Sequence, residues 1–258
     1  MKTNYFNRLR EEAETEEGIS DAAGREGASD AVRPSSESVY SDILEKIIKL
    51  QYAPGEMISE NQMAKEYGVS RTVIRSAFAR LEEAGFVEVY AKKGTYVSRM
   101  NLHYIADLLM LRTAVEKEII SELYQKLDQK KRQELIERLE ENLEKQEKFR
   151  NSSGYLKAYQ ALDQEFHYLM IQSVGRESLM QLLDQNMLHI ARWRNFDVVF
   201  DQRVPELIDE HRRILEDLKR DTSEYAEHSI AAHLETITKI AKRAIHSYPL
   251  YFTDTEFS

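Results

Sequence analysis

The stretch at residues 58–81, ISENQMAKEYGVSRTVIRSAFARL, constrains the fold of this 258-residue chain more than any other feature. It reads as two short helices joined by a tight turn. Ser59, with Gln62 three residues later, has the spacing of a capping box that starts the first helix. Gly68 supplies the left-handed backbone that the turn needs, and Ser70 is placed to cap the second helix. The stretch therefore predicts a helix-turn-helix.

The second of these helices divides its residues between two faces. Its apolar stripe at helical spacing consists of Ile74, Ala77, Phe78 and Leu81. Outside that stripe or at the helix ends lie Ser70, Arg71, Thr72, Arg75 and Arg80. A helix-turn-helix inserts the N-terminal residues of its second helix into the major groove of DNA. We therefore expect these side chains to contact double-stranded DNA rather than to form only a solvated charged face.

The segments on either side of this motif complete a winged helix-turn-helix. A helix is expected from residue 38, with its apolar stripe at Val39, Ile43, Ile47 and Leu50. After the motif, residues 85–90 and 94–97 read as two short strands around a hairpin tip. That tip carries Lys92, Lys93 and Gly94. In such a wing the lysines lie near phosphate, and the glycine lets the backbone approach closely.

Charge and composition limit the partners of the chain. The net charge of −9 excludes a protein that is basic throughout. The segment 70–99 nevertheless carries six basic and three acidic side chains, and local phosphate contacts supply much of the affinity for DNA. The absence of cysteine excludes disulfides and thiolate metal sites. Because no stretch approaches the roughly 20 apolar residues of a membrane helix, we expect a cytoplasmic protein without a membrane partner.

Composition divides the chain into four segments. Residues 1–35 are rich in Glu, Ala, Gly and Ser and read as an acidic disordered tail. Residues 36–100 hold the winged helix-turn-helix, residues 101–250 read as helix almost throughout, and residues 251–258 form a C-terminal tail. Helices are expected at 103–126, 129–149, 154–173, 177–197, 203–219 and 223–247. Since each has an apolar face, they should pack as one antiparallel bundle, which makes the fold class mainly α.

Four polar residues interrupt the apolar stripes of these helices: Asp163, His167, His211 and His233. The first two lie one turn apart on one helix, and the other two lie on apolar faces of two further helices. Taken alone, each histidine could be a core residue bonded to a neighbour. Burying four such groups is costly unless they share a partner, and one divalent cation would satisfy all four. This donor set suits Zn, Ni, Mn or Fe.

The motifs together resemble a known family. Residues 39–99 resemble the GntR family of bacterial transcription regulators through the run PGEMISENQMAKEYGVSRTVIRSAFARLEEAGFVEVYAKKGTYV at 54–97. The helical remainder resembles the ligand-sensing FCD domain of the FadR subfamily. The resemblance implies DNA contacts by Arg71, Thr72, Arg75, Arg80 and Gly94. Val73 stands where the family often has Pro, and Asn61 stands where many members have Arg, so the operator sequence is harder to infer.

The resemblance also implies a sensing site among the C-terminal helices. The order and spacing of the four polar residues are similar to those of the metal-binding branch of the FCD domain, which implies that all four are metal ligands. Arg112, in the family's LR-x-x-[LV]-E pattern, lies on an apolar stripe, where a guanidinium is unusual unless it binds an anion. An ion pair with Glu116 is the alternative. Asn186 and His189 share a helix face and complete the expected effector site.

These features predict a sequence-specific transcription regulator, more specifically a repressor, and not an enzyme. Two copies should bind a pseudo-palindromic operator, because half-site symmetry mirrors protein symmetry. A small carboxylate bound at or beside the metal should modulate that binding. Two alternatives stay open. One is a regulator with a metal-free organic-acid pocket. The other is a metal-dependent hydrolase, for which the chain offers no nucleophile motif and no Gly-rich phosphate loop.

Overall fold

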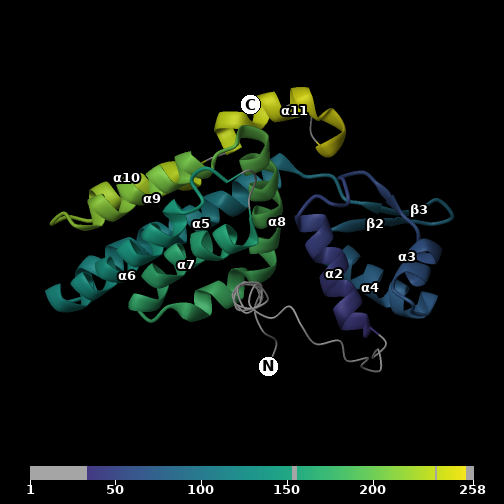
Figure 1. Cartoon of the computed structure of the whole chain (residues 1–258), viewed down its shortest axis with the longest axis horizontal. Coiled ribbons are helices and arrows are strands. Elements are labelled where there is room, and N and C mark those ends of the chain that lie inside the picture. The colour runs from purple at the N-terminus through teal and green to yellow at the C-terminus, as the bar shows by residue number, and fades with distance from the viewer. Residues whose placement is uncertain (1–33, 153–155, 236, 254–258) are drawn as a thin grey trace, which may run out of the picture. The chain divides into compact units, whose positions relative to one another are not determined.

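The computed structural model describes residues 34–152, 156–235 and 237–253, so the expected acidic tail lies almost wholly outside the described residues. Its elements are α2 (Ser36–Ile48), β1 (Met57–Ile58), α3 (Glu60–Glu66), α4 (Arg71–Glu83), β2 (Val87–Tyr90), β3 (Gly94–Val97), α5 (Leu102–Lys126), α6 (Gln129–Glu147), α7 (Lys157–Ser173), α8 (Glu177–Asp201), α9 (Val204–Leu218), α10 (Glu224–Leu234), α11 (Ile237–Ser247) and the 3₁₀ helix η1 (Pro249–Tyr251) (Figure 1). The fold is mainly helical with one small sheet in its N-terminal part, as predicted. Among the described residues, no helix is long and apolar enough to cross a membrane.

The chain divides into two units. The winged unit contains the described residues up to Ile105, together with 191–196 of α8 and the chain from Ala241 onward. The helical unit contains 106–190 and 197–240. Helix α8 therefore contributes residues to both units.

In the winged unit, α4 packs against α2 and α3. The predicted stripe of α4 is buried throughout: Ile74, Ala77, Phe78 and Leu81. Helix α4 begins where expected because the Ser70 hydroxyl accepts a hydrogen bond from the Val73 amide at 3.4 Å. Gly68 has a φ of +64°, the left-handed conformation that the turn required.

Two local predictions in this unit were wrong. Ser59 occupies the N-cap position of α3, but its side chain makes no capping hydrogen bond, so the capping box does not form. Leu50 lies outside α2 rather than at its end. The Gln51 amide donates to the Lys46 carbonyl, the Leu50 amide donates to that of Ile47, and Leu50 itself has a φ of +59°. This is a Schellman motif, which ends the helix before the apolar period ends.

The sheet of the winged unit has the strand order β1-β3-β2. Strands β2 and β3 form the predicted hairpin, with Val87 opposite Val97 and Tyr90 opposite Gly94. Strand β1 pairs with β3 and was not predicted, because two residues are too few to carry a period. At the hairpin tip, Lys92 has a φ of +63° and Gly94 a φ of +115°.

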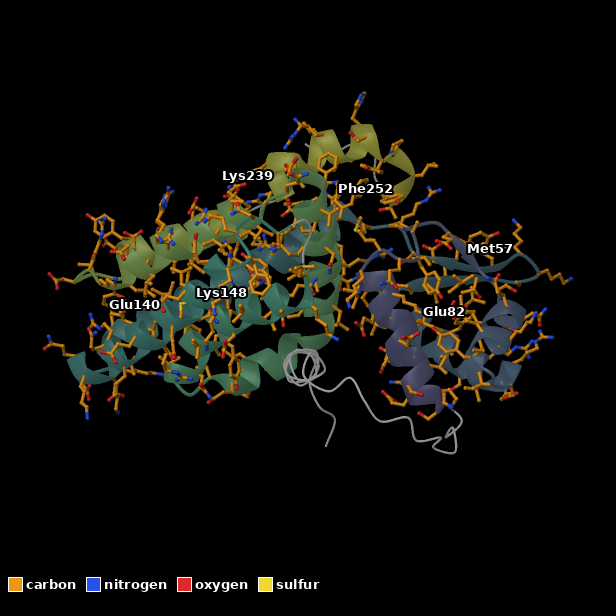
Figure 2. All side chains as sticks on the ribbon, in the orientation of Figure 1. Met57, Glu82, Glu140, Lys148, Lys239 and Phe252 are labelled. Carbon is orange, nitrogen blue, oxygen red and sulfur yellow. The ribbon has the colours of Figure 1, made fainter. Side chains whose placement is uncertain are left out.

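The segment that follows the wing is held by two distant parts of the chain. Arg192 of α8 donates to the Ser98 carbonyl at 2.7 Å and to its hydroxyl at 3.2 Å. The backbone of Met100 exchanges hydrogen bonds with residues 251–253, and Phe252, labelled in Figure 2, is 1% exposed. Residues 251–253 were expected to belong to a tail. Instead they pack on the joint between the wing and α5.

In the helical unit, α6 packs against both α7 and α9, and α10 packs against α9 (Figure 1). The helix expected at 223–247 is two helices, because Glu235, with a ψ of +58°, leaves the helical conformation after α10. The sequence there, ETIT, contains three β-branched residues, which lower helix propensity. The apolar period runs on across the break and therefore did not reveal it.

The cap of α4 gives a test of the winged unit. We expect Ser70→Ala to lower its free energy of unfolding by about 0.5–1 kcal/mol, since the Val73 amide loses its side-chain acceptor and keeps only the Ser70 carbonyl. Ser59→Ala is the matched control, because that N-cap serine makes no capping bond. Thermal unfolding followed by circular dichroism should register a lower midpoint for the first variant only. Equal losses in the two variants would contradict this account of the cap.

Candidate functional site

The predicted DNA-reading side chains Arg71 and Arg75 lie together on the exposed face of α4. Their side chains are 55% and 61% exposed, and both donate to the same carboxylate oxygen of Glu60, at 3.2 and 2.9 Å. Partial desolvation opposes ionisation of Glu60, but the hydrogen bonds and charges of the two arginines outweigh it and lower the pKa of that carboxyl. Thr72 is also exposed. Glu60 thus holds two guanidinium groups side by side, where they stay accessible.

The other predicted DNA contacts have different surroundings. Arg80 forms an ion pair with Glu37 at 2.6 Å, and its guanidinium lies 3.8 Å from the centre of the Tyr40 ring. It is therefore held against α2. Lys92 and Lys93 are exposed at the wing tip. The DNA roles of these residues, of Ser70 and of Gly94 stay predictions.

The four predicted metal ligands meet inside the helical unit. Asp163 and His167 come from α7, His211 from α9 and His233 from α10, and all four side chains are buried. One ligand atom from each lies within 4.8 Å of the others. The Nε2 atoms of His167 and His233 are 3.2 Å apart, and Nε2 of His211 is 3.7 Å from an oxygen of Asp163. Three helices thus bring three imidazoles and one carboxylate to one point.

Each imidazole of this candidate metal cluster (Asp163, His167, His211 and His233) turns its other nitrogen to an oxygen. His167 Nδ1 lies 2.6 Å from Glu116, His233 Nδ1 lies 2.8 Å from Glu210, and His211 Nδ1 lies 2.8 Å from the amide oxygen of Gln146. Because an ionised carboxylate only accepts, Nδ1 of His167 and Nδ1 of His233 carry the proton.

The donor set fits a divalent cation. With the proton on Nδ1, a neutral imidazole has its lone pair on Nε2, the atom that binds metals. The Nε2 lone pairs of His167 and His233 therefore face each other, an arrangement that is unfavourable unless a proton or a cation lies between them. Metal-bound histidines characteristically donate their other N–H to a carboxylate or carbonyl. The cluster has both features: ligand atoms that converge on one point, and histidines whose Nδ1 atoms face oxygens.

Arg112 is connected to the candidate metal cluster through Glu116. Its Nε donates to Glu116 at 2.6 Å, and both side chains are buried. Burial opposes ionisation of Glu116, but the charge of Arg112 and the interactions with His167 outweigh it, so the pKa of Glu116 lies far below its usual range. The ion pair considered from the sequence is therefore present. An effector role for Arg112, and for the half-buried Asn186 and His189 on α8, stays a prediction.

Three residues face the Nδ1 atoms of the histidines and are the outer partners of the cluster, and sequence reasoning missed two of them. Gln146 and Glu210 were not singled out, and Glu116 was named only as a partner for Arg112. Outer partners come from any helix that passes nearby, so no spacing rule identifies them.

Comparisons with known proteins agree with both units. Residues 35–97 match the family described as "Bacterial regulatory proteins, gntR family", and residues 107–236 match "FCD domain". The chain is 28% identical over 196 residues to the uncharacterized HTH-type transcriptional regulator YdhC of Bacillus subtilis, covering 75% of this chain and 85% of YdhC. It is 22% identical over 213 residues to the HTH-type transcriptional repressor RspR of Escherichia coli, covering 82% of this chain and 90% of RspR.

Two solved structures share the fold. A GntR regulator from Rhodococcus superposes with a TM-score of 0.57 at 18% identity, covering 82% of this chain and 97% of that one. McbR/YncC of E. coli gives a TM-score of 0.56 at 16% identity, covering 81% and 97%.

Proposed function

Because the chain belongs to the GntR family of transcription regulators and carries an FCD domain, we propose that it is a repressor whose operator binding responds to a carboxylate effector at a metal centre. The family consists of regulators and not enzymes, so the buried cluster has a sensing role rather than a catalytic one. RspR, a repressor by name, supports the sign of regulation. Two copies acting in the cytoplasm would bind a pseudo-palindromic operator through α4 and the wing.

The observation that carries the proposal is the buried metal cluster. Asp163, His167, His211 and His233 would hold a divalent transition metal, and the bound ion would supply a Lewis-acidic point for an anionic ligand. Asp163 is the one carboxylate among the four ligands. A divalent ion with three neutral imidazoles and one carboxylate keeps one positive charge, which favours an anion.

The outer carboxylates do not cancel that charge. Glu116 is paired with Arg112 at 2.6 Å. Glu210 is paired with Lys239 at 3.3 Å and shares Arg203, at 3.4 Å, with two other carboxylates. Each outer carboxylate therefore has a cation within ion-pair distance. A carboxylate effector bound to the metal would neutralise the centre. This supports a small carboxylate over a neutral or cationic ligand.

Regulation requires that the effector favours one state of the protein over another. Helix α8 contributes residues to both units, so we propose it as the element through which ligand binding reaches the DNA-binding part. A coupling of about 1–3 kcal/mol is typical of such regulators. It would change operator affinity roughly 5- to 150-fold.

Metal analysis tests this function. We expect the purified protein to contain about one equivalent of Zn, Ni, Mn or Fe, and a chelator to lower its melting temperature, since a ligand that binds only the native state stabilises it. Sugar acids and dicarboxylates are then screened for a further rise in melting temperature with and without metal. A carboxylate that stabilises the metal-free and metal-loaded proteins equally would favour the metal-free organic-acid pocket and overturn the metal-centred proposal.

A further inference from the structure

The three histidines of the metal cluster differ in the hydrogen-bond partner of their Nδ1 atoms. His167 and His233 face carboxylates, which only accept hydrogen bonds when ionised. His211 faces the side-chain amide of Gln146 at 2.8 Å. An amide presents either an oxygen or an NH₂ group, depending on how it is turned. The proton position on His211 therefore depends on what orients Gln146.

A chain of hydrogen bonds orients that amide from a backbone carbonyl. Asn142 Nδ2 lies 3.1 Å from the Leu162 carbonyl oxygen and 2.9 Å from the Glu165 carboxylate. Both of these groups accept, so the NH₂ group of Asn142 must face them. The Asn142 oxygen then accepts from Gln146 Nε2 at 2.7 Å. This leaves the Gln146 oxygen facing His211, with both amide side chains almost fully buried.

Turning either amide would place two donors or two acceptors against each other inside the protein. An unmatched buried polar group of this kind costs about 1–3 kcal/mol. The ring of His211 is also held on one face, where it stacks on Phe166 with centroids 4.3 Å apart and an interplanar angle of 18°. The hydrogen-bond chain thus sets the proton, and the stacking sets the plane of the ring.

We propose that Gln146, oriented by Asn142, is a positioning residue of the metal centre. It keeps the proton of His211 on Nδ1 and the lone pair on Nε2 aimed at the metal. This inference deepens the proposed function and rests on it for the metal. Unlike the carboxylates of Glu116 and Glu210, Gln146 performs this role without adding a charge.

The test compares three variants of the full chain on α6. Gln146→Leu removes the acceptor at similar volume, Gln146→Glu keeps an oxygen at the His211 N–H, and Gln133→Leu changes an exposed glutamine on the same helix. Affinity for Co²⁺ is measured by competition with a chelator, and the visible absorption of bound Co²⁺ reports its ligand geometry. Melting of the metal-free proteins reports folding.

We expect Gln146→Leu to weaken Co²⁺ binding roughly 10- to 100-fold, as loss of an outer-shell partner does, with an altered Co²⁺ spectrum. Gln146→Glu should recover part of that affinity, because it restores the acceptor at His211 but sets a second oxygen against the Asn142 oxygen. Gln133→Leu should match the unmodified protein. Unchanged Co²⁺ affinity and spectrum in a folded Gln146→Leu protein would overturn the proposal.

A second measurement does not depend on metal binding or on any variant. Nitrogen-15 NMR of the metal-free, unmodified protein distinguishes the two tautomers of His211. A protonated Nδ1 supports the positioning role, and a proton on Nε2 overturns it. If the unmodified protein binds no metal at all, the proposed function fails, while this tautomer measurement still decides whether His211 carries its proton on the nitrogen that faces Gln146.

Discussion

Arg75→Ala is expected to abolish sequence-specific operator binding while leaving the fold intact. Arg75 is 61% exposed on the face of α4 that is predicted to enter the major groove. A bidentate arginine–guanine contact contributes about 1–3 kcal/mol of discrimination. A dimer on a pseudo-palindromic site would lose that contact twice. The combined loss, on the order of 2–6 kcal/mol, corresponds to a fall in specific affinity of roughly 30-fold to more than 10⁴-fold.

The fold should tolerate this change. The ion pair of Arg75 with Glu60 is solvent-exposed, and exposed pairs contribute about 0–1 kcal/mol. The side chain is not part of the buried stripe of α4. The melting temperature of the Arg75→Ala protein should therefore stay close to that of the unmodified protein, which separates a loss of DNA contact from a loss of structure.

The measurement requires an operator selected from random-sequence DNA by the unmodified protein. Binding to this operator and to a scrambled duplex is then compared at fixed salt, because affinities without a stated salt concentration cannot be interpreted. Arg75→Lys keeps the charge but loses the bidentate geometry, so it should also lose specificity. Arg138→Ala removes an exposed arginine on α6 and serves as the control. Tight, selective binding by Arg75→Ala would refute the placement of α4 in the groove.

The sequence predicted the helix-turn-helix well because several local signals coincide there. The cap at Ser70, the glycine at the turn and the stripe of α4 each act within one or two turns of chain, so each is visible in the sequence and each is present in the structure. The errors in the helix bounds arose where the backbone conformation of a single residue ends a helix. Leu50 continues the apolar period but takes a left-handed backbone, and Glu235 interrupts a period that runs on past it.

In the candidate metal site, too, the sequence indicated some residues and not others. Each of its three histidines, taken alone, could have been an ordinary core residue. The four inner residues could be named because one aspartate and three histidines fall on apolar helical faces, and because their order and spacing resemble the metal-binding branch of the FCD domain. Their convergence to within 4.8 Å depended on how the helices pack. Gln146 and Glu210 could not be found, because glutamine and glutamate are ordinary residues on any amphipathic helix.

The joint after the wing could not be predicted for a different reason. It is held by Arg192 and by residues 251–253, which lie about 90 and 150 residues away in the sequence. The Arg192 guanidinium is buried, and burial lowers its pKa to about 9. Long-range contacts of this kind have no local pattern. The sequence therefore shows nothing of what holds this joint.

His211→Ala is expected to lose most of the metal affinity while keeping DNA binding by the metal-free protein. Outer-shell changes already weaken metal sites roughly 10- to 100-fold, and His211 is a proposed direct ligand, so the loss should be more than about 100-fold. The variant should purify with little metal. A carboxylate that stabilises the unmodified protein through its metal should no longer raise the melting temperature. Because α4 and the wing are untouched, operator binding without effector should persist.

The matched control is His228→Ala, which removes an exposed histidine of α10 outside the metal cluster. This variant should retain the metal content, the chelator-induced fall in melting temperature and the effector response of the unmodified protein. Since His211 is fully buried, its truncation also leaves a cavity. The informative comparison is therefore the gap between the metal-loaded and metal-free melting temperatures, which should disappear in His211→Ala even if both are lower. A gap of unchanged size would remove His211 from the ligand set and leave the site with two imidazoles at most.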